Sequence, residues 1–332
     1  MAYKASIIIP VYNEKKYLSS LCEKLNKSFK DYNIKYIFVD DGSNDGSSKW
    51  LLDNLNLIFY KNNYELINIQ KNIGKGNAIK QGLKKTEGDY TLFIDSDLEY
   101  QPSDLLEMYK LIVNNQNVEV LYGSRNLGGR IQLRRYLLNS IAVKINTFIF
   151  NFLFNQSITD LHTGTKIIKN TLLKKINLTT NGFGLEIDLS SQISKLGINI
   201  YEYSISYFER SLEEGKKITF VDGFLSYYFL LRARFFQNNL STSISLIFSS
   251  LIMIYFGNHF GAGFDKVFFT LIFIIVGLMI ALNRGIIHLS FIYLLTYIGF
   301  ANFSDNYNIY SLIIYFILSL YITTIIKKKF KK

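Results

Sequence analysis

Short apolar runs alternate with longer amphipathic segments along the first 120 or so residues. The runs are nearly continuous rather than alternating, which is typical of strands buried on both faces of a parallel sheet. The segments between them have the length and periodicity of helices. We predict strands at 6–11, 36–39, 66–70, 90–94 and 118–122, and helices at 14–30, 46–55, 76–85 and 103–115. This order predicts an open, mostly parallel α/β fold of the Rossmann-like type.

The last 90 or so residues follow a different pattern. Charged side chains are absent from four long runs, at 235–264, 267–283, 285–304 and 306–326. Such runs are near the ~20 residues that a helix needs to cross the hydrocarbon core of a bilayer. A buried helical bundle is the alternative, but repeated runs of this length are rare in soluble domains. We predict about four transmembrane helices, at about 241–257, 267–283, 286–302 and 308–326.

Basic residues lie on one side of these predicted spans. Arg232 and Arg234 precede the first span, Arg284 follows the second, and five lysines lie within 327–332. The positive-inside rule places such residues in the cytoplasm. We therefore expect an integral, multi-pass membrane protein whose large N-terminal part and C-terminus are cytoplasmic.

Composition and charge change this picture only slightly. The chain is 49% hydrophobic and 19% charged, with a formal net charge of +11. A nucleic-acid binder would carry its positive charge as a contiguous basic face. Here five of the excess lysines belong to the tail, and we expect no nucleic-acid partner. The lone Cys22 excludes a disulfide framework.

Polar residues follow each predicted strand. In open α/β sheets, ligands bind beyond the carboxyl ends of the strands, so these residues are the candidates for chemistry. Each strand end contributes a short polar segment: Tyr12–Glu14, Asp40–Ser43, Asn72–Gly76, Asp95–Glu99 and Gly123–Arg125. The sequence thus predicts an acidic sheet edge with a nearby arginine.

Asp95 and Asp97 are separated by one residue at a strand end. On a turn, both carboxylates and Glu99 can converge on one point. Hard oxygen ligands suit Mg²⁺ or Mn²⁺, usually as one or two carboxylates with substrate phosphates. Such an ion stabilises a diphosphate as a leaving group. The alternative is a turn with a helix N-cap, which Asp also favours.

Two further segments of this edge have both a structural and a functional interpretation. Asp40 and Asp41, followed by Gly42, suit either a β-turn or a contact with ribose or base. Asn72 and Gly76 belong to an N-x-G-x-G segment that matches neither a Walker motif nor a dinucleotide fingerprint. We interpret this segment as backbone donors at a helix N-terminus, near phosphate or sugar.

These motifs together resemble a known family. The segments that carry the resemblance occur in the order Pro10–Glu14, Val39–Ser43, Asn72–Gly76, Asp95–Pro102, Gly123–Arg125, Thr159–Lys166, Gly182–Glu186 and Glu209–Arg210. The chain resembles a family 2 glycosyltransferase with the GT-A fold over about residues 4–235. Within that family it is most similar to the dolichol- or polyprenyl-phosphate mannosyl- and glucosyltransferases.

The resemblance implies roles for individual residues. The nucleotide-sugar contacts would be Pro10, Tyr12, Glu14, Asp40, Asp41, Asn72, Gly76, Asp95 and Ser96. Metal binding would fall to Asp95, Asp97 and Glu99, with Mg²⁺ or Mn²⁺ as the cofactor. The catalytic residues would be Asp97, Arg125, Arg210 and Lys217. The acceptor phosphate would be held by Arg135, Arg210, Lys216 and Lys217.

The implied activity is inverting transfer of a single sugar to a membrane polyprenyl phosphate on the cytoplasmic leaflet. The donor would be of the GDP-mannose or UDP-glucose type, and the bilayer itself would be a partner. A homo-oligomer is left open. One alternative is a processive polysaccharide synthase, since Gln132–Tyr136 reads Q-x-x-R-Y, close to the Q-x-x-R-W signature of such enzymes. Another is a non-catalytic membrane scaffold with a transferase-like domain.

The predicted organisation combines these elements. A GT-A domain occupies 1–220 and includes interfacial helices at about 131–155, where apolar and aromatic residues follow basic ones. A juxtamembrane amphipathic helix follows at 221–240. The transmembrane domain takes 241–326, and a basic cytoplasmic tail takes 327–332.

Overall fold

The computed structural model describes residues 3–59, 63–115, 117–182 and 184–211, together with residues 213, 226, 229, 230, 233 and 234. The four predicted spans and the tail at 327–332 lie outside the described residues. Lys216, Lys217 and most of the predicted juxtamembrane helix at 221–240 also lie outside them. Their assignments therefore stay predictions.

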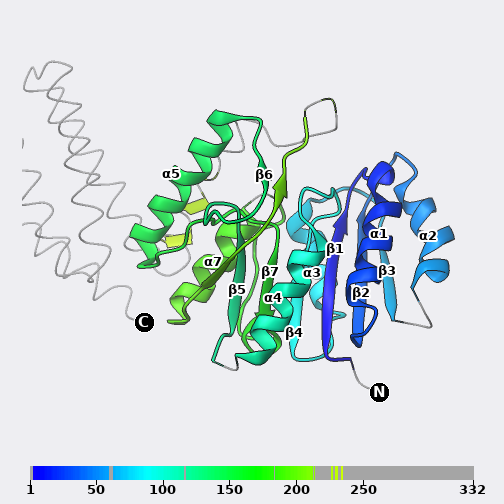
Figure 1. Cartoon of the computed structure of the whole chain (residues 1–332), viewed down its shortest axis with the longest axis horizontal. Helices are drawn as coiled ribbons and strands as arrows, with labels where there is room; N and C mark the ends of the chain where they lie inside the picture. Colours follow the sequence, from blue (N-terminus) through cyan, green and yellow to red (C-terminus); the bar gives the residue numbers. More distant parts are fainter. Residues whose placement is uncertain are drawn as a thin grey trace, which may run out of the picture. The chain divides into compact units, whose positions relative to one another are not determined.

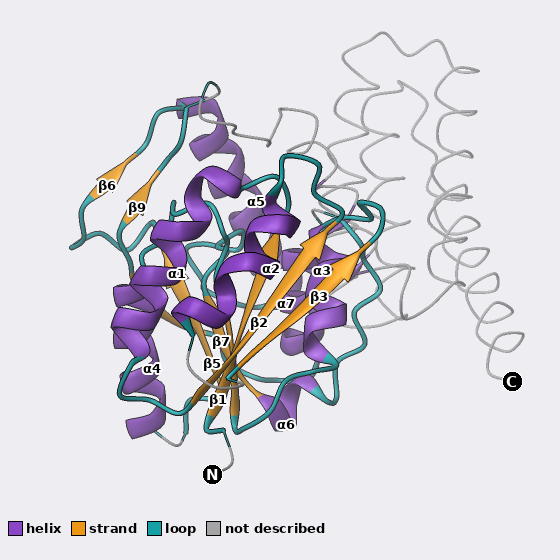
Figure 2. Ribbon diagram, turned by 90° about the vertical axis from the view of Figure 1, so that its right-hand side faces the viewer, coloured by secondary structure: helices purple, strands orange, loops and turns teal. Residues whose placement is uncertain are grey.

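A seven-stranded sheet forms the centre of the described part, in the order β3-β2-β1-β4-β7-β5-β8 (Figures 1 and 2). Its strands are β1 Ala5–Val11, β2 Ile34–Asp41, β3 Tyr64–Ile69, β4 Tyr90–Phe93, β5 Val120–Ser124, β7 Lys166–Lys169 and β8 Tyr201–Ser204. All neighbours are parallel except β7, which is antiparallel to both β4 and β5. The predicted mostly parallel α/β sheet is confirmed.

Helices cover both faces of this sheet. One face packs against α1 Lys15–Phe29, α2 Ser47–Ile58 and α4 Pro102–Asn114. The other face packs against α3 Lys75–Leu83, α6 Asn170–Leu173 and α7 Leu185–Lys195. Successive strand residues point to opposite faces, so Ile7 and Ile9 join the first core while Ile8 joins the second. This explains why the strands read as continuous apolar runs.

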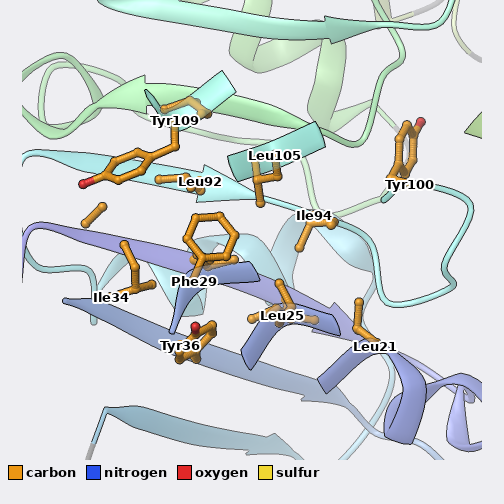
Figure 3. Packing of buried hydrophobic residues seen from close by; sticks show 14 of the residues in the cluster. Leu21, Leu25, Phe29, Ile34, Tyr36, Leu92, Ile94, Tyr100, Leu105 and Tyr109 are labelled. Carbon is orange, nitrogen blue, oxygen red and sulfur yellow. The ribbon is translucent and has the colours of Figure 1, made fainter. Parts of the chain in front are cut away.

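The larger core lies between β1, β2, β4 and the helices α1 and α4. In Figure 3, Leu25 and Phe29 of α1 point toward Tyr36 of β2, with Leu92 of β4 and Leu105 of α4 above them. All five side chains are buried. Burial of this kind makes the sheet a rigid base for the polar residues at its edge.

A smaller unit stands beside the main sheet. It consists of β6 Gln132–Leu133, β9 Tyr207–Phe208 and the long helix α5 Leu137–Phe154. Strands β6 and β9 pair in parallel, and Figure 2 shows this pair set apart from the main sheet. The chain reaches this unit through the long connection between β5 and β7.

Several predicted boundaries differ from the structure by a few residues, and two of these differences affect the site. Asp40 and Asp41 belong to β2 instead of following it, because they pair with Val11 of β1 and Ile69 of β3. The helical segment predicted at about 131–155 begins only at Leu137. Before it the chain is extended, since Gln132 and Leu133 pair with β9. A partner strand 75 residues away could not be read from local periodicity.

Candidate functional site

The turn after β4 presents three carboxylates at the carboxyl edge of the sheet. Leu98 has a φ of 60°, a left-handed conformation that is rare outside glycine, and it reverses the chain between Asp97 and Glu99. The backbone N–H of Glu99 donates to Asp97 Oδ1 at 3.1 Å. Leu98 also packs against the core below. The core thus compensates for the strained turn that places Asp95 and Asp97 at the edge.

Arg210, just after β9, pairs with the acids at this edge. Its Nη1 lies 2.8 Å from Glu14 Oε2, and its Nη2 lies 2.8 Å from Asp97 Oδ2. Its backbone N–H donates to Glu99 Oε1 at 2.9 Å. The guanidinium carbon lies 5.2 Å from the ring centre of Tyr17, a cation–π arrangement. Arg210 therefore joins β9 to three of the acidic residues that the sequence singled out.

Lys75 pairs with the remaining acid of the turn. Its Nζ lies 2.8 Å from Asp95 Oδ1 and 3.0 Å from Glu186 Oε1, at the start of α7. Burial alone lowers the pKa of Lys75, but Asp95 and Glu186 outweigh it and raise that pKa above its ordinary value. Lys75 stays charged as the internal counter-ion of Asp95. This role of Lys75 could not be read from the sequence, because neither the segment before α3 nor the one before α7 reveals that the two helices begin side by side.

Gly164 leaves the space that the Asp95 carboxylate occupies. A Cβ added at Gly164 would lie 2.2 Å from Asp95 Oδ2 and 2.9 Å from Tyr100 Cε2. The Gly164 N–H also donates to the Tyr100 hydroxyl at 2.9 Å. Asp95 is therefore enclosed by backbone on one side and by Lys75 on the other.

Asp95, Asp97 and Glu99, which we predict as metal ligands, do not form one cluster in the described part of the structure. Among the described residues, no three His, Cys, Asp or Glu side chains are arranged to hold a metal. Glu99 is turned toward β9, where it accepts the Tyr207 hydroxyl at 2.7 Å as well as the Arg210 N–H. In this arrangement Glu99 is bound by β9 and Arg210, and its part in metal binding stays a prediction.

Two carboxylates with a substrate diphosphate still suit a hard divalent cation. Burial, followed by the negative charges of Glu99 and Asp95, raises the pKa of Asp97 to about 7. Arg210 opposes that rise, so one arginine does not neutralise the local negative charge. Carboxylate crowding of this kind, with hard oxygen donors, fits Mg²⁺ or Mn²⁺ at Asp97 and Asp95.

Asp40 and Asp41 are buried at the end of β2 and bind the protein's own groups. Asp40 accepts the hydroxyl of Ser43. Asp41 accepts the backbone N–H groups of Ile73 and Gly74, at 3.2 Å and 2.7 Å. Two of the backbone N–H groups that we expected near a phosphate therefore donate to Asp41 in this structure. Its carboxylate fixes the loop before α3.

The glycines of the N-x-G-x-G segment allow another segment to approach closely. A Cβ at Gly76 would lie 2.5 Å from Thr180 O, and one at Gly74 would lie 2.6 Å from Asn181 O. The Asn77 N–H donates to Asn181 O at 3.0 Å. Residues 180–182 thus cover the start of α3. Asn72, in contrast, is exposed.

The other predicted donor contacts lie around the same edge. Pro10 is at the end of β1, Tyr12 follows that strand and is half-buried, and Glu14 and Ser96 are buried. Pro10 lines a small cavity with Lys75 and Asp95. These residues therefore lie on the sheet edge where the sequence predicts them, and their contacts with a donor stay a prediction.

Arg125 follows β5 and is largely neutralised by Asp160. Its Nε and Nη2 donate to the two Asp160 oxygens at 2.6 Å and 2.8 Å, and the Asp160 side chain is fully buried. Burial alone would raise the pKa of Asp160, but Arg125 outweighs it and lowers that pKa. The guanidinium also faces the ring of Tyr207, 5.0 Å from its centre. Arg125 thus ties β5 to the segment before β7.

Arg135 is the exposed arginine of the predicted acceptor set. Its Nε donates to the Glu209 carbonyl at 2.9 Å, and its backbone N–H donates to the Glu209 carboxylate. Glu209 is itself buried. These bonds hold Arg135 beside Arg210, the next residue after Glu209. Lys216 and Lys217 lie outside the described residues.

Two further buried groups were not assigned a role from the sequence. Burial lowers the pKa of Lys166 to about 8, although Glu186 opposes that shift. Its Nζ donates to the Thr163 carbonyl and faces the Tyr122 ring. Burial also lowers the pKa of His162 to about 4, so that its imidazole is neutral. Neither burial is visible in a motif.

Comparison with protein families gives one match over half of the chain. The profile of "Glycosyl transferase family 2" matches residues 6–176. An uncharacterised protein of Methanocaldococcus jannaschii is 30% identical over 206 residues, covering 60% of this chain and 86% of that protein.

Curated relatives with named activities include two polyprenyl-phosphate transferases. Undecaprenyl-phosphate 4-deoxy-4-formamido-L-arabinose transferase of Proteus mirabilis is 38% identical over 104 residues, 31% of each chain. Dolichyl-phosphate beta-glucosyltransferase of Dictyostelium discoideum is 27% identical over 218 residues, covering 61% of this chain and 66% of that protein. The chain thus spans less than two thirds of both named relatives.

Solved structures with the same fold include glucosyl-3-phosphoglycerate synthase from Mycobacterium tuberculosis. Its complex with Mn²⁺, UDP and glucosyl-3-phosphoglycerate superposes with a TM-score of 0.53 at 17% identity, covering 70% of this chain and 80% of that one. The crystal structure with phosphoglyceric acid gives the same TM-score at 18% identity. At these identities the likeness concerns the fold alone.

Proposed function

Since the chain belongs to glycosyl transferase family 2, we propose that it transfers one sugar from a nucleotide sugar to a membrane polyprenyl phosphate. The named relatives support this acceptor class, because their names specify undecaprenyl phosphate and dolichyl phosphate. The donor would be of the GDP-mannose or UDP-glucose type. The product would be a polyprenyl-phosphate sugar on the cytoplasmic leaflet.

One observation carries this proposal: the turn after β4 presents Asp95 and Asp97 beside Arg210, at the carboxyl edge of the sheet. Sugar transfer from a nucleotide diphosphate needs charge stabilisation on the departing diphosphate. Carboxylates that share a cation, with arginines next to them, suit that requirement. A scaffold without catalysis would have no need of such buried charge.

We infer that Asp97 and Asp95 bind Mg²⁺ or Mn²⁺ together with the donor diphosphate, whose developing charge that ion would neutralise. Lys75 keeps Asp95 in place through its pair with Glu186. Asp40, Asp41, Pro10, Tyr12 and Glu14 would border the nucleotide. Ser96 would lie next to them, and the exposed Asn72 and buried Gly76 would lie at the rim.

On the acceptor side, we assign one arginine a structural role and another a role in binding. Arg125 is bonded to Asp160 and would orient the site, whereas the exposed Arg135 would grip the lipid phosphate. Lys216, Lys217 and Arg210 would complete that cationic set. Arginine can bind a phosphate through two parallel hydrogen bonds, which fixes its orientation.

The chemical step follows from these positions. A phosphate oxygen is already deprotonated near pH 7, so the reaction needs no general base. The lipid phosphate oxygen would attack the anomeric carbon in line as the bond to the diphosphate breaks. Attack on the opposite face inverts the configuration at that carbon.

Helix α5 would hold this site against the bilayer. Its exposed side chains form one stripe, in which every member except Lys144 is apolar: Leu137, Leu138, Ile141, Lys144, Ile145, Phe148 and Phe152. By length and composition α5 is also the one helix of the described residues that could cross a membrane, and 28% of it is buried. An apolar exposed stripe beside arginines is typical of an interfacial helix. We propose that α5 lies in the headgroup region.

The proposal is tested by incubating membranes that contain the full chain with labelled nucleotide sugars, Mn²⁺ and polyprenyl phosphate. Transfer of one sugar to a lipid that organic solvent extracts, with inverted configuration, is the expected result. A long insoluble polymer would instead identify a processive synthase. No turnover with any donor would identify a scaffold, and retained configuration would exclude in-line attack.

Asp97 is the residue whose loss should be decisive in that assay. Asp97→Ala removes the carboxylate that pairs with Arg210 and that we assign to the metal. We expect transfer to fall below detection while the protein still inserts into membranes. Near-normal transfer by Asp97→Ala would remove the metal assignment. Asp53→Ala, on α2 away from the edge, is the matched carboxylate control.

A further inference from the structure

Arg210 is a counter-ion of the carboxylates at the acidic edge of the sheet. Its guanidinium bridges Glu14 and Asp97, with both contacts at 2.8 Å. The side chains of all three residues are largely buried, at 10% exposure for Arg210, 6% for Glu14 and 16% for Asp97. A divalent cation on Asp97 would meet this positive charge at close range. The two cations therefore compete for the same carboxylate.

One hydrogen-bond donor of the Arg210 side chain stays unused in this position. Within the described residues, its Nε is buried and has no hydrogen-bond partner. The Glu99 oxygen nearest to it is 3.7 Å away, beyond hydrogen-bond distance. A buried donor without a partner weakens the pairing, because its desolvation is not compensated. The arrangement is thus one that a better ligand for Asp97 can displace.

We propose that Arg210 is an internal counter-ion that a divalent cation must displace from Asp97, so that the metal binds with the donor diphosphate instead of alone. This inference rests on the metal site of the proposed function. The diphosphate supplies the negative charge that the displaced guanidinium then pairs with. Arg210 thereby couples metal binding to binding of a phosphate group at the same edge.

The anchoring of Arg210 allows its side chain to move while its backbone stays in place. The backbone N–H is held by Glu99, and Glu209 before it is held by Arg135. Only the guanidinium contacts Glu14 and Asp97. An arginine stays protonated at every pH at which the protein is folded, so the competition is between two cations and involves no titration of Arg210.

The test measures Mn²⁺ binding to the full chain in detergent, without nucleotide or acceptor, from the loss of the electron paramagnetic resonance signal of free Mn²⁺. Replacement by an uncharged side chain, Arg210→Gln, should tighten Mn²⁺ binding at least about tenfold, because a charge-assisted hydrogen bond no longer opposes the metal. Arg130→Gln is the matched control, since Arg130 also pairs with a carboxylate, that of Glu107 on α4. It should leave Mn²⁺ binding unchanged.

A second variant covers a failure of Arg210→Gln to fold. Arg210→Lys keeps the charge but cannot bridge two carboxylates with a planar fork, so its Mn²⁺ affinity should lie between the other two. Adding UDP, or GDP in a separate experiment, should reduce the difference in Mn²⁺ affinity between Arg210→Gln and the wild type, because the wild-type guanidinium then binds the diphosphate.

The inference is overturned if Arg210→Gln binds Mn²⁺ no more tightly than the wild type, or if Arg130→Gln gains as much. It is equally overturned if neither the wild type nor Arg210→Gln binds Mn²⁺ at all. These outcomes are independent of sugar transfer. A chain that transfers no sugar but shows the Mn²⁺ difference loses the proposed function and keeps the counter-ion role of Arg210.

Discussion

At the scale of single residues, the site consists of paired charges instead of isolated ligands. Asp95 pairs with Lys75, Asp97 with Arg210, and Asp160 with Arg125. Removing one member of a buried pair leaves the other uncompensated, which typically destabilises a protein by about 3–5 kcal/mol. Variants at these positions therefore report on stability as well as chemistry. Substitutions that shift a pair without removing a charge are more informative.

Gly164→Ala is such a substitution. The added methyl would lie 2.2 Å from Asp95 Oδ2. The carboxylate would have to move although Lys75 holds it, so we expect transfer to fall at least about tenfold through misplacement of the site. Gly182→Ala is the control, because no atom of the residues that the structure describes lies within 4 Å of its added methyl. Equal activity of the two variants, measured with the lipid-transfer assay, would contradict the enclosure of Asp95.

Lys166 predicts a dependence of stability on pH. Burial lowers its pKa from 10.5 to about 8, so between these pH values the unfolded chain holds a proton that the folded chain has lost. Stability then rises with pH across that window. Lys166→Met removes this gain. The stability of the variant relative to the wild type should therefore fall by about 2 kcal/mol from pH 7 to pH 10, or several degrees in thermal midpoint.

Thermal unfolding of both proteins in the same detergent, at several pH values, measures this difference. Other lysines and tyrosines titrate in the same range, but they do so in both proteins and cancel in the comparison. A stability difference that is constant with pH would mean that Lys166 keeps its ordinary pKa.

At the scale of elements, α5 is the helix whose exposed face is unlike that of a soluble protein. Phe148 is 69% exposed and Leu138 is 69% exposed on the same stripe. Other exposed apolar side chains, such as Leu57 on α2 at 77%, are not part of such a stripe. Exposed apolar residues are unremarkable singly, but a continuous patch marks an interaction site.

A tryptophan at position 148 tests the interfacial proposal. Trp50 is the chain's one tryptophan, so Trp50→Phe gives a dark background. In that background, the fluorescence of Phe148→Trp should be strongly quenched by brominated lipids, because an interfacial helix buries its apolar face about 5–10 Å deep. Leu57→Trp should be quenched little. Equal quenching at both positions would argue against membrane contact by α5.

At the scale of the whole molecule, the prediction concerns the four spans outside the described residues. Alternating loops should lie on opposite sides of the membrane, as basic residues predict. Cys22 is the one cysteine of the chain and is buried. In a Cys22→Ala background, Ala262→Cys should react with a membrane-impermeant maleimide on intact cells. Asn283→Cys, beside Arg284, should react only after the membrane is opened.

Two labelling results would count against this prediction. Reaction of both cysteines on intact cells, or of neither, would contradict the predicted topology. A cysteine introduced at Phe330, within the lysine-rich tail, should behave like the one at position 283.

Much of the fold could be predicted because the signal is local. The runs Ile7–Val11 and Tyr36–Val39 carry apolar or aromatic side chains at every position, since each strand is covered on both faces. The edge of the sheet that carries Asp95 and Asp97 followed from that pattern. The strand β7 could not be predicted as antiparallel, because its insertion between β4 and β5 depends on contacts far apart in sequence.

The partners of the site residues were beyond prediction for the same reason. Arg125 was expected to be catalytic, and its own motif does not specify that it pairs with Asp160, 35 residues away. Glu99 was expected at the metal, yet it binds Tyr207 and the backbone of Arg210. A motif specifies which side chain is present but not which neighbour neutralises it.

The sequence by itself determined the fold class, the acidic edge and the family, because hydrophobic periodicity and motif order are properties of neighbouring residues. Tertiary structure alone decided how the charges pair. Lys75 meets Asp95 and Glu186 because α3 and α7 begin at the same edge, and Arg210 meets Asp97 because β9 runs beside the turn that follows β4. Charge pairing depends on distance in space, and a buried charge takes the nearest partner that compensates its lost hydration.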